Sequence, residues 1–245
     1  MNRATRTAIT ALALGLAGGA AQALGLYDPA QGSLPAAQGW LSFCPPTQCA
    51  AQLGGGVFDF DTLGAGLGTQ AGLSRLDQTL DAEGGYRLDF RLRVLDELHA
   101  SGHRAGFSLI AVGSTPSQAL EIGFWRDQVW VYDLDDGAFV RGASSALDTT
   151  AWHDYRLTAR DGGFLLQADG RTLLQGSLRD YSAFGPPYSL RNFLFLGDDT
   201  TSAGAHVQLG AIALSAVPAV PEPASALLML GGLGLLAEAL RRRAS

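Results

Sequence analysis

The feature that most constrains the fold is the segment 86–94, in which apolar and charged side chains alternate without exception. Successive side chains of a β-strand point to opposite faces, so this pattern predicts a strand with one face buried and the other in water. The buried face carries Tyr86, Leu88, Phe90, Leu92 and Val94. A strand of this kind needs a sheet and a second layer to cover its apolar side.

Further short apolar or alternating runs follow along the chain and predict more strands, at 106–112, 119–125, 129–133, 155–160, 164–168, 172–175, 192–196 and 206–215. Asp169-Gly170 separates two of them by two residues, which predicts a hairpin turn with positive φ at both positions. Asp161-Gly162-Gly163 and Arg126-Asp127 predict other tight turns. No long amphipathic helix is evident in this region, so we predict an all-β sandwich or barrel.

The N-terminus predicts a secretory signal peptide over residues 1–23. Arg3 and Arg6 precede an apolar stretch over 8–19, and Ala21-Gln22-Ala23 is a small-x-small cleavage site. We expect export by the general secretion machinery and a mature chain that begins at Leu24. Residues 24–217 then form one domain, and residues 218–245 form a separate C-terminal signal.

The C-terminal signal has three parts: Pro221-Glu222-Pro223, an apolar run over 224–240 and Arg241-Arg242-Arg243. The run is shorter than the roughly 20 apolar residues that span a membrane comfortably, so we predict a marginal hydrophobic helix. The arginines favour a cytoplasmic C-terminus, which leaves the Pro-Glu-Pro triplet on the outer side. The two prolines keep that triplet extended and open to a protease.

These three parts resemble the PEP-CTERM signal of Gram-negative bacteria. The resemblance implies export across the inner membrane, transient anchoring, processing by an exosortase-type membrane protease, and residence at the cell surface or outside the cell. The alternative is an ordinary C-terminal anchor that is never cut.

The stretch Trp152-His153-Asp154-Tyr155, followed by the Asp169-Gly170 hairpin, resembles laminin-G and concanavalin A-like domains. The resemblance implies an antiparallel β-sandwich of the jelly-roll type, with Trp152 and Tyr155 in its core. Five other segments resemble the "choice-of-anchor" group of bacterial surface domains, which brings no assigned activity: 26–29, 38–40, 104–108, 121–125 and 195–203.

The charge balance excludes one class of partner. The chain has 17 basic and 23 acidic residues, and without the five terminal arginines and two terminal glutamates these become 12 and 21. A domain with about nine net negative charges repels phosphate backbones, so we expect no binding to nucleic acid. The two cysteines, Cys44 and Cys49, predict a local disulfide in an exported protein.

Catalytic signals are weak. Laminarinase-type glycosidases on this fold carry a Glu-x-Asp-x-x-Glu strand, whose two carboxylates act as nucleophile and general acid. The nearest segment here starts at Glu121, with Gly123 and Arg126 in place of the other two carboxylates. We expect Glu121 to pair with an arginine on a sheet face and the protein not to be an enzyme. Glu97, His99 and His103 form a second polar cluster, which could bind a metal or be solvated.

Two features suggest ligand binding. Asp198 and Asp199 follow an apolar strand and could hold calcium, the one cofactor suggested, or stabilise a turn by Asx-type hydrogen bonds. Trp125, Trp130 and Tyr132 lie on neighbouring predicted strands and either form an exposed stacking platform for sugar rings or pack in the core.

The sequence therefore favours a non-enzymatic structural or display protein at the cell surface, in an exopolysaccharide or biofilm context. The first alternative is a carbohydrate-binding module with extracellular polysaccharide as its partner, and the second is an atypical glycan hydrolase. A binding module requires a groove lined with aromatic rings, whereas a hydrolase requires two carboxylates that meet in a cleft.

Overall fold

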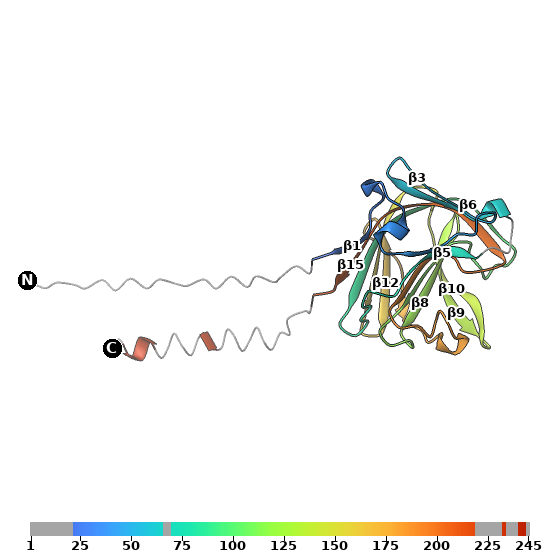
Figure 1. The fold of residues 1–245 in the computed structure, drawn as a ribbon. Helices are drawn as coiled ribbons and strands as arrows, with labels where there is room; N and C mark the ends of the chain where they lie inside the picture. Colours follow the sequence, from blue (N-terminus) through green and yellow to red (C-terminus); the bar gives the residue numbers. More distant parts are fainter. Residues whose placement is uncertain (1–21, 66–69, 219–231, 234–239, 244–245) are drawn as a thin grey trace, which may run out of the picture.

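The computed structural model describes residues 22–65, 70–218, 232–233 and 240–243. Within these ranges two antiparallel sheets pack face to face as a β-sandwich (Figure 1). The predicted all-β sandwich is thus confirmed. The signal peptide falls almost entirely outside the described residues, and so does most of the predicted C-terminal helix. No helix among the described residues is long and apolar enough to cross a membrane.

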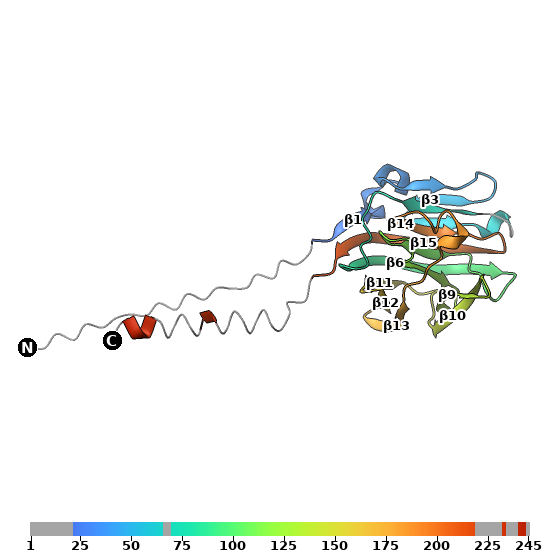
Figure 2. The ribbon, with the colours of Figure 1, turned by 90° about the horizontal axis from the view of Figure 1, so that it is seen from below.

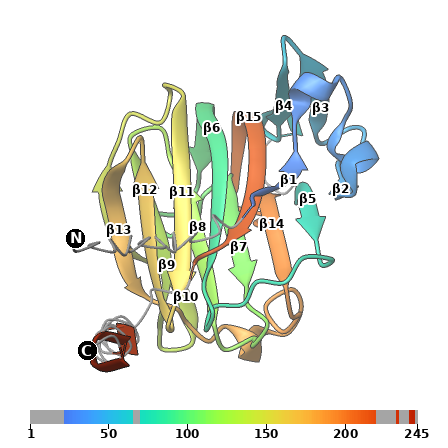
Figure 3. The ribbon, with the colours of Figure 1, turned by 90° about the vertical axis from the view of Figure 1, so that its left-hand side faces the viewer.

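The first sheet has eight strands in the order β13-β12-β11-β6-β15-β4-β3, with β1 also paired to β15. Figure 3 shows these strands side by side as one layer in front of the second sheet. Their bounds are β1 Leu24–Tyr27, β3 Ala50–Gly54, β4 Val57–Asp61, β6 Tyr86–His99, β11 His153–Arg160, β12 Gly163–Ala168, β13 Arg171–Ser177 and β15 Ala203–Ala216.

The second sheet has seven strands in the order β10-β9-β8-β7-β14-β5-β2. Their bounds are β2 Leu41–Phe43, β5 Ala71–Arg75, β7 Ser108–Val112, β8 Ala119–Phe124, β9 Gln128–Asp135, β10 Ala138–Ala146 and β14 Phe193–Asp198. Four short 3-10 helices lie in the connections: η1 Pro29–Gln31, η2 Pro35–Gln38, η3 Leu63–Ala65 and η4 Ser182–Phe184.

The main core lies between the sheets and follows from the alternation in β6. Its five apolar residues are all at most 3% exposed, and they face the alternate residues Leu109, Leu120 and Ile122 of the second sheet. Each buried side chain of this size stabilises the fold by about 2 kcal/mol. The resemblance to laminin-G and concanavalin A-like domains implied that Trp152 and Tyr155 lie in the core. This is confirmed for Tyr155, which is 1% exposed, but Trp152 is only half-buried. Its ring packs against the guanidinium groups of Arg91 and Arg93 instead, at 5.2 and 5.0 Å.

The turn predictions are confirmed. Asp169 and Gly170 have φ of 51° and 80° between β12 and β13, and Asp161 and Gly162 repeat the pattern between β11 and β12. Figure 2 shows the resulting succession of β6, β11, β12 and β13. The short or exposed strands β1 to β5 and β10 were not predicted. β4 does alternate, with Phe58 and Phe60 buried, but over only five residues, whereas β2 is exposed along its whole length.

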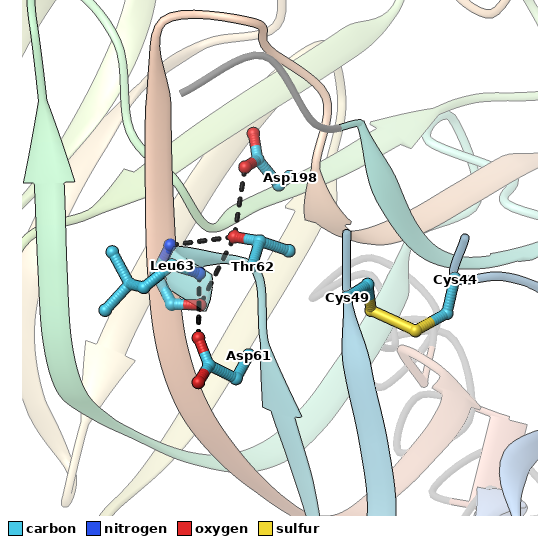
Figure 4. Close-up of a disulfide and its surroundings, with 7 residues drawn as sticks. Cys44, Cys49, Asp61, Thr62, Leu63 and Asp198 are labelled. Carbon is cyan, nitrogen blue, oxygen red and sulfur yellow. Dashed lines mark hydrogen bonds between the residues drawn. A yellow bond between two sulfur atoms is a disulfide. The ribbon is translucent and has the colours of Figure 1, made fainter. Parts of the chain in front are cut away.

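Two features tie down the N-terminal part of the chain. Cys44 and Cys49 form the predicted disulfide, which closes the loop between β2 and β3 (Figure 4). β1 pairs with the last part of β15, Leu24 opposite Leu214. The chain therefore enters β1 and leaves β15 at the same end of the sandwich (Figure 1).

Candidate functional site

Every second residue of the second sheet points away from the main core, and these side chains form what we call the outer face. Backbone pairing places Phe195, Ile110 and Glu121 in one row across β14, β7 and β8. The next row places Gly123 opposite Trp130 on β9. Aromatic rings dominate this face, and Glu121 is the carboxylate in its middle.

The segment that connects β13 to β14 covers this face. Tyr181 and Tyr188 from the segment are 0% and 8% exposed. Their rings pack around Phe139, with centroids 5.1 Å away in both cases. Tyr181 also donates a hydrogen bond of 2.7 Å from its hydroxyl to the backbone oxygen of Tyr132. The outer face is therefore a second, smaller core rather than an open surface.

The predicted aromatic platform is consequently wrong as an exposed surface. Trp125, Trp130 and Tyr132 are 5%, 0% and 1% exposed. Trp125 stacks on His99 at 4.1 Å and donates from Nε1 to the backbone oxygen of Arg104. The three rings pack against one another because Gly123 leaves room for them: a Cβ there would lie 2.7 Å from the indole of Trp130.

Glu121 does not form the arginine ion pair that the sequence suggested. It is 1% exposed, and its Oε2 accepts a hydrogen bond of 2.6 Å from the hydroxyl of Tyr188. Burial raises the pKa of Glu121 well above its usual range, and the neighbouring negative charge of Asp199 raises it further. Arg104 is close enough to oppose this shift only in part. The charged form of the Glu121 carboxyl is therefore disfavoured in the folded protein.

Asp199 is the second carboxyl of this cluster. Sequence reasoning considered Glu121 and Asp199 separately, but it did not pair them and did not name Tyr188. The hydroxyl of Tyr188 lies 3.4 Å from its Oδ2 and so stands between the two carboxyls. Burial also raises the pKa of Asp199. We call Glu121, Asp199 and Tyr188 the carboxyl cluster. The three residues are far apart in sequence, so no short motif contains them. Glu121 lies on β8 and Asp199 directly follows β14, and both strands pair with β7. Tyr188 comes from the connection between β13 and β14.

Several polar atoms of the outer face lack a hydrogen-bond partner among the described residues. They include Glu121 Oε1, Asp199 Oδ1 and Trp130 Nε1. Buried polar atoms are usually paired, because each unpaired group costs about 1–3 kcal/mol of desolvation. Their concentration around one carboxyl cluster identifies the outer face as the candidate functional site.

Asp198 and Asp199 do not form a joint calcium site. Asp198 continues the alternation of β14 and points into the sandwich, where its Oδ2 lies 3.1 Å from the hydroxyl of Thr62 (Figure 4). Its Oδ1 accepts from the backbone of Thr200, which is the predicted Asx-type contact. Asp199 belongs to the opposite face. Within the described ranges no group of three or more histidine, cysteine, aspartate or glutamate residues is placed to hold a metal ion.

The other polar cluster is also dispersed. His99 Nδ1 lies 2.7 Å from Glu97, and its ring stacks on Trp125. His103 instead accepts a hydrogen bond from the backbone of Arg141. Glu97 and His99 thus form a local pair at the edge of the sandwich, without the third ligand that the sequence suggested.

A pocket of about 390 Å³ opens beside the carboxyl cluster. Tyr188 and Asp199 form its inner wall, and exposed Phe43 of β2 stands at its edge. The other lining residues come from β5, β7 and β14 and the neighbouring loops: Gln70, Ala71, Gly72, Ser74, Ile110, Pro187, Phe193, Phe195 and Asp198.

We expect Tyr188→Phe to lower the free energy of unfolding by about 1–3 kcal/mol, because the buried Glu121 carboxyl loses its hydrogen-bond donor. Urea denaturation at pH 7 measures the change. Tyr155→Phe is the matched control: the Tyr155 hydroxyl is buried without a partner among the described residues, so its removal should change stability by less than about 0.5 kcal/mol or increase it. Equal losses for the two variants would contradict the assigned role of Tyr188.

Comparison with known proteins identifies the C-terminal segment. Residues 219–244 match the PEP-CTERM protein-sorting motif. The motif begins three residues after the end of β15, so the sandwich is followed almost directly by the sorting signal. This confirms the resemblance of the Pro-Glu-Pro triplet, the apolar run and the arginine cluster. PEP-CTERM signals mark exported, surface-sorted proteins. A search of the curated proteins found no match to the chain.

Solved structures share the sandwich at low identity. A carbohydrate esterase from Shiga toxin-encoding bacteriophage phi24B has a TM-score of 0.55 and 17% identity, over 80% of this chain and 99% of that one. The alginate lyase A1-II', of polysaccharide lyase family 7, has a TM-score of 0.50 and 12% identity, over 79% and 100%. A galectin-like protein from Bacillus subtilis has a TM-score of 0.49 and 12% identity, over 80% and 98%. At these identities the likeness shows the fold alone.

Proposed function

We propose that this PEP-CTERM protein is exported across the inner membrane of a Gram-negative bacterium, cut by an exosortase-type protease, and displayed at the cell surface or in the surrounding matrix. The observation that carries the proposal is the sorting motif at 219–244, which follows the last strand of the sandwich almost directly. The acidic surface, rich in solvated carboxylates, is suited to an extracellular environment.

A structural, non-enzymatic role fits the outer face best. The hydroxyl of Tyr188 bonds Glu121 at 2.6 Å and lies 3.4 Å from Asp199, and the two carboxyls are themselves within hydrogen-bonding reach of each other. A retaining glycosidase needs its two carboxylates about 5 Å apart with the glycosidic bond between them. In this chain a side chain of the protein occupies that position, and the covering segment is packed by Tyr181 and Phe139.

The site of attachment determines how the domain is displayed. β15 leads into the sorting motif at the same end of the sandwich where β1 begins (Figure 1). While the tail is in place, that end faces the membrane and the opposite end, with Thr62 and Asp198, faces away. The outer face then stands along the side of the displayed domain.

Mass spectrometry of the protein recovered from a host that carries an exosortase tests the proposal. We expect the mature chain to lack Glu238 and Arg241-Arg242-Arg243 and to end near Pro221-Glu222-Pro223. Glu222→Ala should preserve the intact tail, because it alters the triplet, whereas Pro218→Ala just outside it should be processed normally. An intact tail on the unaltered protein, in the presence of the exosortase, would indicate a plain membrane anchor.

A carbohydrate-binding role is the second candidate. It is supported by the sandwich shared with a carbohydrate esterase and an alginate lyase, and by the pocket beside the carboxyl cluster. An atypical glycan hydrolase is the third candidate, and it depends on the carboxyl pair alone.

A further inference from the structure

We propose that the pocket beside Tyr188 binds an uncharged, hydroxyl-bearing sugar ring, with aromatic rings as its floor and the carboxyl cluster as hydrogen-bond acceptor. The proposal is independent of tail processing, so either one can fail while the other holds. We call this hollow the Tyr188 pocket; its lining residues are given above.

Apolar side chains of β7 and β14 form one part of the lining of the Tyr188 pocket. Phe193 and Phe195 are two residues apart on β14, and their rings are nearly parallel, with an interplanar angle of 11° and centroids 6.3 Å apart. Ile110 continues this floor on β7. Gly72 on β5 allows the ring of Phe195 to lie against the strand, because a Cβ at this position would be 2.5 Å from the ring. These stacked rings give the pocket apolar aromatic surface, against which the apolar face of a sugar ring can pack.

The inner wall supplies acceptors that lack a partner. Asp199 lines the pocket, and its Oδ1 is buried without a hydrogen-bond partner among the described residues. Glu121 does not line the pocket and is 1% exposed, and its Oε1 also has no hydrogen-bond partner among the described residues. Buried acceptors of this kind require a hydroxyl or N–H donor.

Tyr188 shows which group the carboxyl cluster accepts. Its hydroxyl lies between the two carboxyls, 2.6 Å from Glu121 Oε2 and 3.4 Å from Asp199 Oδ2. The phenol thus contacts one oxygen of each carboxyl, and the other oxygen of each is buried without a partner among the described residues. Asp199 as a whole is half-buried and lines the pocket, so a sugar hydroxyl there can donate to its carboxyl, whereas the buried Oδ1 is reached only after a local rearrangement.

The charges of the pocket exclude acidic ligands. Asp198 and Asp199 are the acidic residues that line it, and the lining residues include no arginine or histidine. A uronate, sulfate or phosphate group would meet the Asp199 carboxyl with no cation in the lining, since Arg104, whose charge acts on Asp199, does not line the pocket. Two like charges in a partly desolvated site repel each other at a cost of several kcal/mol. A neutral hydroxyl avoids this cost. The chemistry therefore favours a neutral glycan over the acidic polysaccharides.

The edge strand β2 completes the binding surface. Phe43 is 63% exposed at the edge of the pocket, where it can cover the second face of a bound ring. Leu41 on the same strand is 64% exposed but does not line the pocket. These two residues form a matched pair, since neither contributes a buried side chain to the fold and only one borders the proposed site.

Isothermal titration of the purified full chain with linear hexasaccharides tests the proposal. The probes are neutral cello-, laminari-, malto- and mannohexaose, with a mannuronate and a glucosamine hexamer for comparison. We expect at least one neutral hexamer to bind and the mannuronate hexamer to give no heat of binding. Phe43→Ala should weaken binding about tenfold, the equivalent of one aromatic contact, and Leu41→Ala by less than about twofold.

Asp199→Asn provides the second arm, because it keeps the size of the side chain and weakens the acceptor. We expect about a tenfold or greater loss of affinity, with a melting temperature no lower than that of the unaltered protein because a buried carboxyl has been neutralised. Silence of all four neutral hexamers would overturn the proposal. So would binding of the charged hexamers alone, or equal losses for Phe43→Ala and Leu41→Ala.

Discussion

Gly106→Ala will lower the free energy of unfolding by more than about 3 kcal/mol, and at 37 °C it will leave the protein largely unfolded. A Cβ at this position would lie 2.0 Å from the backbone carbon of Gly204 and 2.2 Å from its oxygen. Gly204 cannot yield easily, since it lies in β15 and pairs with Leu98 of β6. Relief of the overlap must therefore separate backbone segments that hold the two sheets together.

Gly102→Ala is the control, four residues earlier in the same connection. A Cβ there would meet no atom within 4 Å, so we expect a change of less than about 0.5 kcal/mol. Urea denaturation followed by tryptophan fluorescence compares both variants with the unaltered protein. A Gly106→Ala protein as stable as Gly102→Ala would show that the close approach of Gly106 to β15 is not required.

Asp198→Asn will make the protein more stable at pH 8 and leave its stability at pH 4 almost unchanged. Asp198 is 0% exposed, and burial raises its pKa to about 8, with a smaller contribution from the charge of Asp199. The hydroxyl of Thr62 donates to Asp198 Oδ2 at 3.1 Å (Figure 4), which opposes this shift only in part. An asparagine amide has the same size and can keep a hydrogen bond with Thr62 without a charge that titrates.

The direction of the pH effect follows from proton uptake. In the unfolded chain Asp198 loses its proton near the ordinary aspartate pKa of 3.8, whereas in the folded protein it keeps the proton up to about pH 8. Between these values the folded state binds more protons, so the free energy of unfolding falls as pH rises. The slope approaches about 1.4 kcal/mol per pH unit for one whole proton. The contribution is complete below pH 3.8 and lost above about pH 8.

Chemical denaturation at pH 4, 6 and 8 measures the profile. The difference between Asp198→Asn and the unaltered protein should grow with pH and reach on the order of 3 kcal/mol or more at pH 8. Asp135→Asn, at an exposed position in the β9–β10 hairpin, should give the same profile as the unaltered protein. A constant difference across the three pH values would contradict a buried, protonated Asp198.

Much of the sandwich is predictable because strand patterns are local. The alternation over 86–94 fixes which face of β6 is buried, and Asp169-Gly170 fixes a hairpin through the φ angles that its two residues tolerate. The exposed edge strand β2 has no such pattern. Its pairing with β5 depends on the backbone of a neighbour that arrives later in the chain.

The candidate site was predicted less well. Trp125, Trp130 and Tyr132 were correctly placed on neighbouring strands, but their exposure depends on whether another segment covers them. Residues from other strands provide that cover: His99 of β6 stacks on Trp125, and Phe139 of β10 packs against Tyr132. Asp198 and Asp199 are adjacent in sequence, yet the alternation of β14 sends them to opposite faces of the sheet.

The sequence by itself determined the β-sandwich and the PEP-CTERM address, because both are written in short stretches whose chemistry acts locally or is read as a linear signal. Only the tertiary structure decided what the outer face contains. Glu121 meets Asp199 and Tyr188 because β7 pairs with β8 on one side and with β14 on the other, while the β13–β14 connection folds over the result. Burial changes the pKa values and the accessibility of these groups. It results from the packing of several strands and a connection, so no single stretch of the sequence shows it.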